Sequence, residues 1–310
     1  MALLVLRQRA SRRRARAAAA AEALALLHDL GPAAPAGGPL ADRGGVLWVE
    51  LPERHLGAAV ARLPRLGYTT AVDLVEAAAA GGVGGGRGHG RARPGRPGRG
   101  REAGWRLARL YTEDPAGHRE QGPDRREFLV EGGDGQVRPV RGYRGDGRAL
   151  GRRGLPVCDA RLLVNLVAPA GPGPLVDPFA GVGGVALAAR AAGWPVLTAD
   201  RDPALRHGLA GLGADHLVAD ARRLPLRPGS VDAVATEPPY DPTAGPLAAE
   251  ALAEVARLLR PGGATAWLCA AWQAPGLRTA AAALGLRATL DTPVDRKGTP
   301  VVALAWRTPF

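Results

Sequence analysis

Residues 175–184, LVDPFAGVGG, decide the fold. A short apolar strand ends at Asp177 and runs into a glycine-rich turn, and a helical segment follows at Val185–Ala192. Glycine permits positive φ angles and lets a ligand come close to the backbone. The free N–H groups at the start of the following helix are a second feature of ligand sites. The segment therefore predicts a strand, turn and helix that hold a small molecule.

Apolar runs and helical segments alternate on both sides of this turn, which is typical of a doubly wound α/β sheet. The last two strands flank a turn at residues 295–298 and predict an antiparallel C-terminal hairpin. The predicted strands are Leu175–Asp177, Val196–Asp200, Asp215–Ala219, Val231–Thr236, Ala264–Ala270, Leu286–Thr292 and Pro300–Trp306, and the further helices are Pro203–Leu212, Pro246–Leu259 and Pro275–Leu284.

The chain before residue 155 has a different composition. Residues 1–44 combine an arginine-rich start with a Pro/Gly-rich stretch, and we expect a disordered basic tail and linker. Residues 45–154 are predicted to form a smaller α+β domain, and its Gly/Arg-rich insert at 81–104 is expected to be disordered because it has too few apolar residues for a core. Its expected elements are the strands Val46–Glu50, Tyr68–Val75, Trp105–Tyr111, Glu127–Glu131 and Gln136–Val140 and a helix within Glu53–Leu63.

The net charge of +12 is unevenly distributed. Residues 1–30 carry +4 and residues 81–106 carry +6, so the rest of the chain is nearly neutral. The two cysteines, Cys158 and Cys269, exclude a disulfide framework and a cysteine-based zinc site, and the histidines lack ligand spacing, so we expect no metal. No apolar run is long enough to span a membrane, and a reducing, cytoplasmic setting is expected.

Three acidic residues follow successive strands of the predicted sheet: Asp177, Asp200 and Asp220. Ligands bind at the carboxyl ends of the strands in such sheets. The turn lacks the Gly-x-Gly-x-x-Gly pattern, and a carboxylate at Asp177 would repel a pyrophosphate, so a nicotinamide dinucleotide is disfavoured. S-adenosylmethionine has an amino group, a ribose and an adenine for these three carboxylates. The expected cofactor contacts are Asp177, Pro178, Phe179, Ala180, Gly181, Gly183, Asp200, Arg201, Asp220 and Ala221, although acidic strand ends also serve as structural caps.

A second motif, Glu237-Pro238-Pro239-Tyr240, follows the strand at Val231–Thr236. Two prolines stiffen the loop and leave carbonyl groups free to accept hydrogen bonds. The Glu237 carboxylate and the Pro238 carbonyl are two acceptors for the two hydrogens of an NH2 group, and Tyr240 has a flat face for stacking on a base. We predict these four residues as the catalytic loop; a rigid turn that only ends the strand is the alternative.

Residues 155–310 resemble the class I S-adenosylmethionine-dependent methyltransferases. The 177–184 turn is similar to the cofactor loop of amino-methyltransferases, and residues 237–240 are similar to their catalytic (Asp/Asn)-Pro-Pro-Tyr element. Residues 155–167 resemble the helix before that loop in the RNA methylase family that includes the tRNA guanosine-N2 methyltransferases. The resemblance implies a Rossmann-like sheet, S-adenosylmethionine as cofactor, and second-rank site residues Asp159, Arg161 and Asn165 beside it.

The chain departs from that family at Glu237, where members usually carry Asp or Asn. The extra methylene moves the carboxylate by about 1.5 Å on a fixed backbone. Either the loop retracts to compensate, or activity is reduced or lost. A catalytically inactive cofactor- or RNA-binding protein of the same fold is therefore an alternative to an enzyme.

The expected substrate is an exocyclic amine of a nucleobase, guanine N2 in tRNA or another structured RNA, with the base flipped into the site. An arginine-rich segment at residues 138–153 could contact phosphates, or it could be an ordinary solvated turn. DNA adenine N6, cytosine N4 and a protein glutamine amide also present an NH2 group, so these substrates remain alternatives. The expected partner is thus nucleic acid, and no membrane partner is expected.

Overall fold

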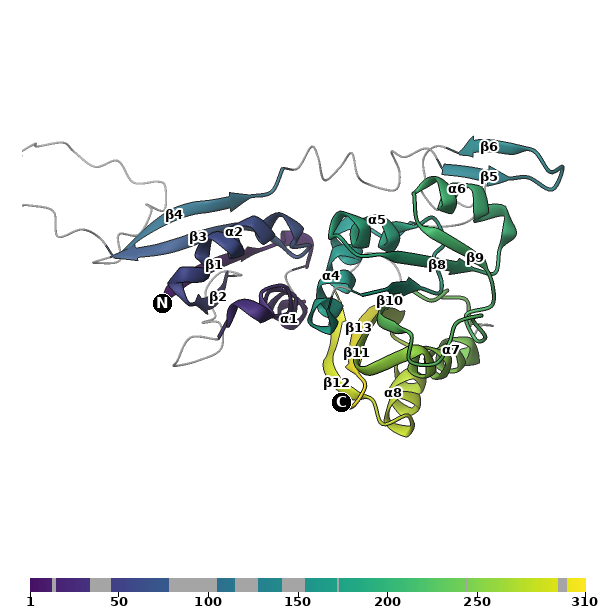
Figure 1. Ribbon diagram of the computed structural model, residues 1–310. Coiled ribbons are helices and arrows are strands. Elements are labelled where there is room, and N and C mark those ends of the chain that lie inside the picture. The colour runs from purple at the N-terminus through teal and green to yellow at the C-terminus, as the bar shows by residue number, and fades with distance from the viewer. Residues whose placement is uncertain are drawn as a thin grey trace, which may run out of the picture.

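In the computed structural model of the chain, the described residues form three β-sheets, of four, seven and two strands (Figure 1). The predictions for the 81–104 insert, for the arginine-rich stretch beyond residue 140 and for the turn at 295–298 lie outside the described residues. The described residues are 1–12, 15–33, 46–77, 105–114, 128–140, 154–171, 173–242, 245–294 and 300–310.

The seven-stranded sheet has the order β12-β13-β11-β10-β7-β8-β9. The strands from β7 to β11 pair in parallel, and β13 lies antiparallel between β11 and β12. The predicted doubly wound sheet with an antiparallel C-terminal hairpin is confirmed. The strands are β7 (Leu175–Asp177), β8 (Val196–Asp200), β9 (Asp215–Val218), β10 (Val231–Thr236), β11 (Leu259–Ala270), β12 (Arg287–Val294) and β13 (Val301–Arg307).

Helices cover both faces of this sheet (Figure 1). One core joins residues of α4 and α5 to one face, and a second core joins α7 and α8 to the other. Central strands buried on both faces need apolar residues at nearly every position, and VDAVAT of β10 is almost entirely buried. The helices are α4 (Val157–Val167), α5 (Gly184–Ala191), α6 (Arg206–Gly211), α7 (Gly245–Leu258) and α8 (Ala274–Ala283).

The N-terminal unit is an antiparallel sheet of order β2-β1-β3-β4 with two helices. The expectation that residues 1–44 form a disordered tail is wrong for their described part, because β1 lies inside this sheet with Leu4 and Leu6 fully buried. Two of its arginines are paired and largely buried: Arg9 contacts Glu113, and Arg12 contacts Asp159. The elements are β1 (Ala2–Gln8), α1 (Arg16–Leu26), β2 (Val46–Leu51), α2 (Leu56–Arg62), β3 (Thr69–Ala77) and β4 (Trp105–Thr112).

The strands β5 (Phe128–Glu131) and β6 (Val137–Val140) form a separate hairpin. It was predicted within the smaller α+β domain, but it lies beside α6 of the large sheet's unit and apart from the N-terminal sheet (Figure 1). The physical reason is that Phe128 and Val130 form a small apolar face that packs on a helix rather than pairing with a strand edge.

Candidate active site

A cavity of about 500 Å³ lies at the carboxyl ends of β7, β8 and β10. Its volume is within the range of about 300–1,000 Å³ typical of small-molecule sites. It brings the two predicted motifs together on one rim of the sheet. The predicted residues that line it are Asp177, Pro178, Phe179, Ala180, Gly181, Asp200, Arg201, Asp220, Ala221, Glu237, Pro238, Pro239 and Tyr240. Lining residues that the sequence did not single out are Gly154, Leu155, Val182, Gly184, Val185, Asp202 and Leu247.

Gly183 is the predicted cofactor contact that the structure places outside the lining. It precedes α5 with φ +75°, and a Cβ there would lie 2.2 Å from Leu212 Cδ1. The glycine is therefore required for helix packing and for its left-handed backbone. Gly181, with φ +50°, does line the cavity.

Asp200 ties the glycine turn to the end of β8. Its Oδ2 accepts a hydrogen bond from the Gly181 N–H at 2.9 Å, and its Oδ1 accepts from the Asp202 N–H at 2.9 Å. The Ala180 N–H also donates to the Ala199 carbonyl at 3.0 Å. Two of these hydrogen bonds join the glycine turn to β8, and the third shapes the turn that follows β8.

Asp177 is almost completely buried at the floor of the cavity. Its Oδ1 accepts from the Thr236 hydroxyl at 2.7 Å and from the Phe179 N–H at 3.3 Å. Burial raises the pKa of Asp177 to about 7, and the charges of Asp200 and Glu237 act in the same direction. A cation bound nearby would favour the ionised carboxylate.

Asp220 lines the cavity with a side chain that is 39% exposed to solvent. Arg222 holds its carboxylate at 2.6 Å, and this hydrogen bond lowers the pKa of Asp220. Asp220 is therefore ionised at neutral pH and accepts hydrogen bonds. It lies in the turn after β9, as the strand-end pattern predicts.

The Glu237–Tyr240 loop is braced from within and from β11. The Tyr240 hydroxyl donates to Glu237 Oε1 at 2.5 Å. Gln273 Nε2 donates to the Pro239 carbonyl at 2.9 Å, while Gln273 Oε1 accepts from the Ala270 N–H at 2.9 Å. Gln273 was not predicted from the sequence, although it follows a strand of the same sheet, as the three aspartates do.

Residues 177–267 match a family described as "Methyltransferase domain". The chain contains an S-adenosylmethionine-dependent methyltransferase domain. A search among curated proteins gives no significant match.

The methyltransferase is also similar to solved structures at low identity. TrmN from Thermus thermophilus is 19% identical, with 99% of this chain and 100% of that chain covered and a TM-score of 0.49. Geranyl diphosphate C-methyltransferase from Streptomyces coelicolor A3(2) is 16% identical over 49% of this chain and 76% of that chain, with a TM-score of 0.43. Ribosomal protein L11 methylase from Lactobacillus delbrueckii is 17% identical over 49% and 78%, with a TM-score of 0.41.

The donor set of the cavity suits this cofactor. The lining carries the carboxylates of Asp177, Asp200, Asp202, Asp220 and Glu237, and within the described part of the chain it carries one basic residue, Arg201. Such a lining complements a sulfonium and an ammonium group, and it would repel the pyrophosphate of a dinucleotide. Phe179, which meets Trp267 edge to face at 6.2 Å between ring centroids, adds an apolar surface.

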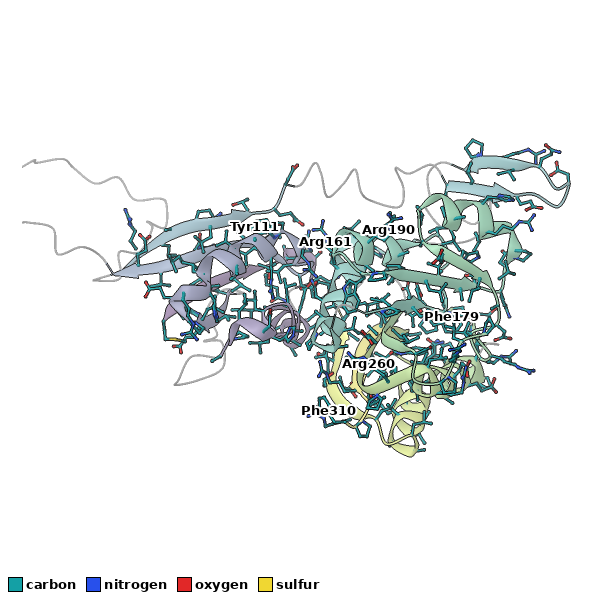
Figure 2. All side chains as sticks on the ribbon, viewed as in Figure 1. Tyr111, Arg161, Phe179, Arg190, Arg260 and Phe310 are labelled. Carbon is teal, nitrogen blue, oxygen red and sulfur yellow. The ribbon has the colours of Figure 1, made fainter. Side chains whose placement is uncertain are left out.

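The second-rank residues of α4 are directed away from the cavity, which corrects the prediction that they lie beside the cofactor. Asp159 binds Arg12 and the Tyr68 hydroxyl, and Asn165 Nδ2 donates to Glu22. Arg161 donates to the Pro64 carbonyl and lies where α4 faces the N-terminal unit (Figure 2). The chain borders the cavity just before this helix, at Gly154 and Leu155.

Two further kinds of feature are absent from the described residues. No group of three or more His, Cys, Asp or Glu side chains there could hold a metal ion. None of the helices described has the length and apolar character needed to cross a membrane.

Proposed function

We propose that this methyltransferase modifies an exocyclic amine of a nucleobase, guanine N2 in tRNA or another structured RNA, in the cytoplasm. The observation that carries the proposal is that the Glu237–Tyr240 loop lines the same cavity as the acidic strand ends. A methyl donor and an amine bound there would meet at one rim. We further propose residues 155–310 as the extent of the domain.

The cofactor supplies an electrophilic methyl group when bound. Asp177 would hold its ammonium group, Asp200 its ribose hydroxyls, and Asp220 its adenine amino group. Arg201, Pro178 and the backbone of the 179–181 turn complete the walls, together with Ala221. The burial of Asp177 would strengthen its contact with the ammonium group, because water screens a buried charge only weakly.

The catalytic loop would orient the amine. The Glu237 carboxylate and the Pro238 carbonyl accept the two N–H hydrogens, which leaves the nitrogen lone pair directed at the cofactor. The Tyr240 ring, fixed by its hydroxyl, would lie against the flipped base. Transfer would form the N–C bond as the methyl group leaves the sulfonium, and the nitrogen would carry a positive charge that the Glu237 carboxylate stabilises until water takes up the proton.

The longer side chain at Glu237 is accommodated in a way that supports an active enzyme. The hydrogen bond from Tyr240 fixes one carboxylate oxygen and bends the side chain back toward its own loop. The extra methylene relative to Asp would thereby be taken up within the side chain, and Gln273, which follows β11, donates to the Pro239 carbonyl.

The test is transfer of labelled methyl from S-adenosylmethionine to bulk tRNA, followed by digestion to nucleosides. Wild type is expected to label N2-methylguanosine, and Glu237→Ala is expected to lose about 10²–10⁴ in kcat. Glu53→Ala, which removes an exposed glutamate of the N-terminal unit, is the control and should retain full activity. Equal labelling by wild type and Glu237→Ala would remove Glu237 from the mechanism. Label in DNA or protein but not in RNA would overturn the proposed substrate.

A further inference from the structure

The β5–β6 hairpin packs one face onto the segment that follows β8. Phe128 and Val130 are buried in a cluster with Leu205 and Leu209. These two leucines belong to the 3₁₀ turn at Pro203–Leu205 and to α6. The neighbouring Leu129 lies on the other face and is 41% exposed.

The same cluster includes Ala180 and Val182 of the glycine turn, and both residues line the cofactor cavity. The 3₁₀ turn at Pro203–Leu205 begins directly after Asp202, another lining residue, whose carboxylate accepts from the Ala204 N–H at 2.9 Å. The hairpin therefore supports both turns that Asp200 joins at the wall of the cavity.

Close packing and ion pairs fix the hairpin on α6. The Phe128 ring lies so near the helix backbone that a Cβ on Gly208 would come within 2.3 Å of it. Glu131 pairs with Arg206 at 2.7 Å and with His207 at 3.1 Å. Glycine at position 208 therefore leaves the space that the Phe128 ring occupies.

We propose that the β5–β6 hairpin is a positioning element of the cofactor site. It lies outside the doubly wound sheet and touches no cofactor group itself. Its apolar face holds the glycine turn and the end of β8 at the spacing that S-adenosylmethionine needs. A glycine-rich turn has little internal stiffness, so without this support it would spread over several conformations and bind the cofactor more weakly.

The test is calorimetric binding of S-adenosylhomocysteine to the full chain. Phe128→Ala is expected to weaken binding tenfold or more and to raise KM for S-adenosylmethionine with a smaller change in kcat. Phe128→Leu should restore binding to within about threefold of wild type. Leu129→Ala truncates the adjacent residue on the exposed face of the same strand and should bind within twofold of wild type.

Gly208→Ala is the second variant, in case Phe128→Ala fails to fold. This variant changes no residue of the hairpin, but the added Cβ displaces the Phe128 ring. It should therefore also weaken binding. Thermal unfolding of each variant shows that the chain is folded. Binding within twofold of wild type by both Phe128→Ala and Gly208→Ala would overturn the proposal. This inference rests on the cavity being the cofactor site, and because the readout is cofactor binding, it is independent of whether RNA is the methyl acceptor.

Discussion

Removing the Arg12 guanidinium tests whether the N-terminal strand and helix belong to the folded protein. Arg12 Nε and Nη2 bind the two carboxylate oxygens of Asp159 at 2.9 and 2.8 Å. The side chains are 8% and 0% exposed, and the Tyr68 hydroxyl donates to the same carboxylate at 2.8 Å. Because the pair joins residue 12 to α4, its energy is available only if the N-terminal unit is docked there.

The expected magnitude follows from this burial. Arg12→Met leaves the Asp159 carboxylate buried with a hydroxyl but no counter-charge, and breaking one side of a buried pair costs about 3–5 kcal/mol. Adding Asp159→Asn removes the uncompensated charge and keeps an acceptor for Tyr68. The double variant should therefore recover to within about 1–2 kcal/mol of wild type. Asp159→Asn alone should cost at least about 1 kcal/mol, because it removes the counter-charge of the buried Arg12 guanidinium, so the cycle gives a coupling energy above about 2 kcal/mol.

The assay is the free energy of unfolding in urea, followed by circular dichroism. Arg106→Met serves as the control, because Arg106 is 75% exposed in its pair with Glu76 and such pairs contribute about 0–1 kcal/mol. If Arg12→Met falls within 1 kcal/mol of wild type and the coupling is near zero, Arg12 is not buried against α4. The N-terminal residues would then form the tail that the sequence predicts.

Three more predictions concern buried acids and one glycine. Burial raises the pKa of Asp177 to about 7, so its carboxylate is mostly ionised at pH 8 and mostly protonated at pH 6. In calorimetry, wild type should bind S-adenosylhomocysteine about tenfold more tightly at pH 8 than at pH 6. Asp177→Asn should bind it weakly at both pH values. Burial also raises the pKa of Glu22 from 4.5 to about 7, so its contribution to stability is full below pH 4.5 and is lost as the pH rises through 7. In urea unfolding, Glu22→Gln should reduce by about 3 kcal/mol the loss of unfolding free energy that wild type shows between pH 4.5 and neutral pH. An unchanged pH profile would contradict the raised pKa of Glu22. Gly183→Ala should destabilise the chain by about 1–3 kcal/mol more than Gly193→Ala. Both glycines have positive φ, but only a Cβ at position 183 would collide with Leu212. Equal unfolding free energies of the two variants would refute the packing argument.

The methyltransferase half was predictable because its signals are local. The parallel strands read as short apolar runs, and helical periodicity separates them. Once β7, β8 and β10 are known to be parallel, their carboxyl ends must share one rim, which brings Asp177, Asp200 and Glu237 together without any knowledge of side-chain contacts. The same reasoning, extended to β11, would have included Gln273.

The strand β1 and the helix α1 were misjudged because their decisive partners are distant in sequence. The alternation of Ala2, Leu4 and Leu6 is a strand signal, but the arginines around it resemble a solvated tail until Asp159, which lies 147 positions away, is seen to pair with Arg12. The polar face of α4 was assigned to the cofactor for the same reason. A sequence shows that a helix has a polar face and does not show which neighbour that face meets.

In the proposed reaction, charge would separate the two substrates. Most of the net charge of +12 lies in residues 1–30 and 81–106, and it would favour a polyanionic partner. The cavity has the opposite character, because its lining carries five carboxylates and, among the described residues, one arginine. A phosphate backbone drawn to the surface would therefore be kept out of the cavity, while a neutral base can enter it and a cationic cofactor is favoured there. An exocyclic amine fits this division, since it reaches the acidic rim with hydrogens to donate and no charge to be repelled.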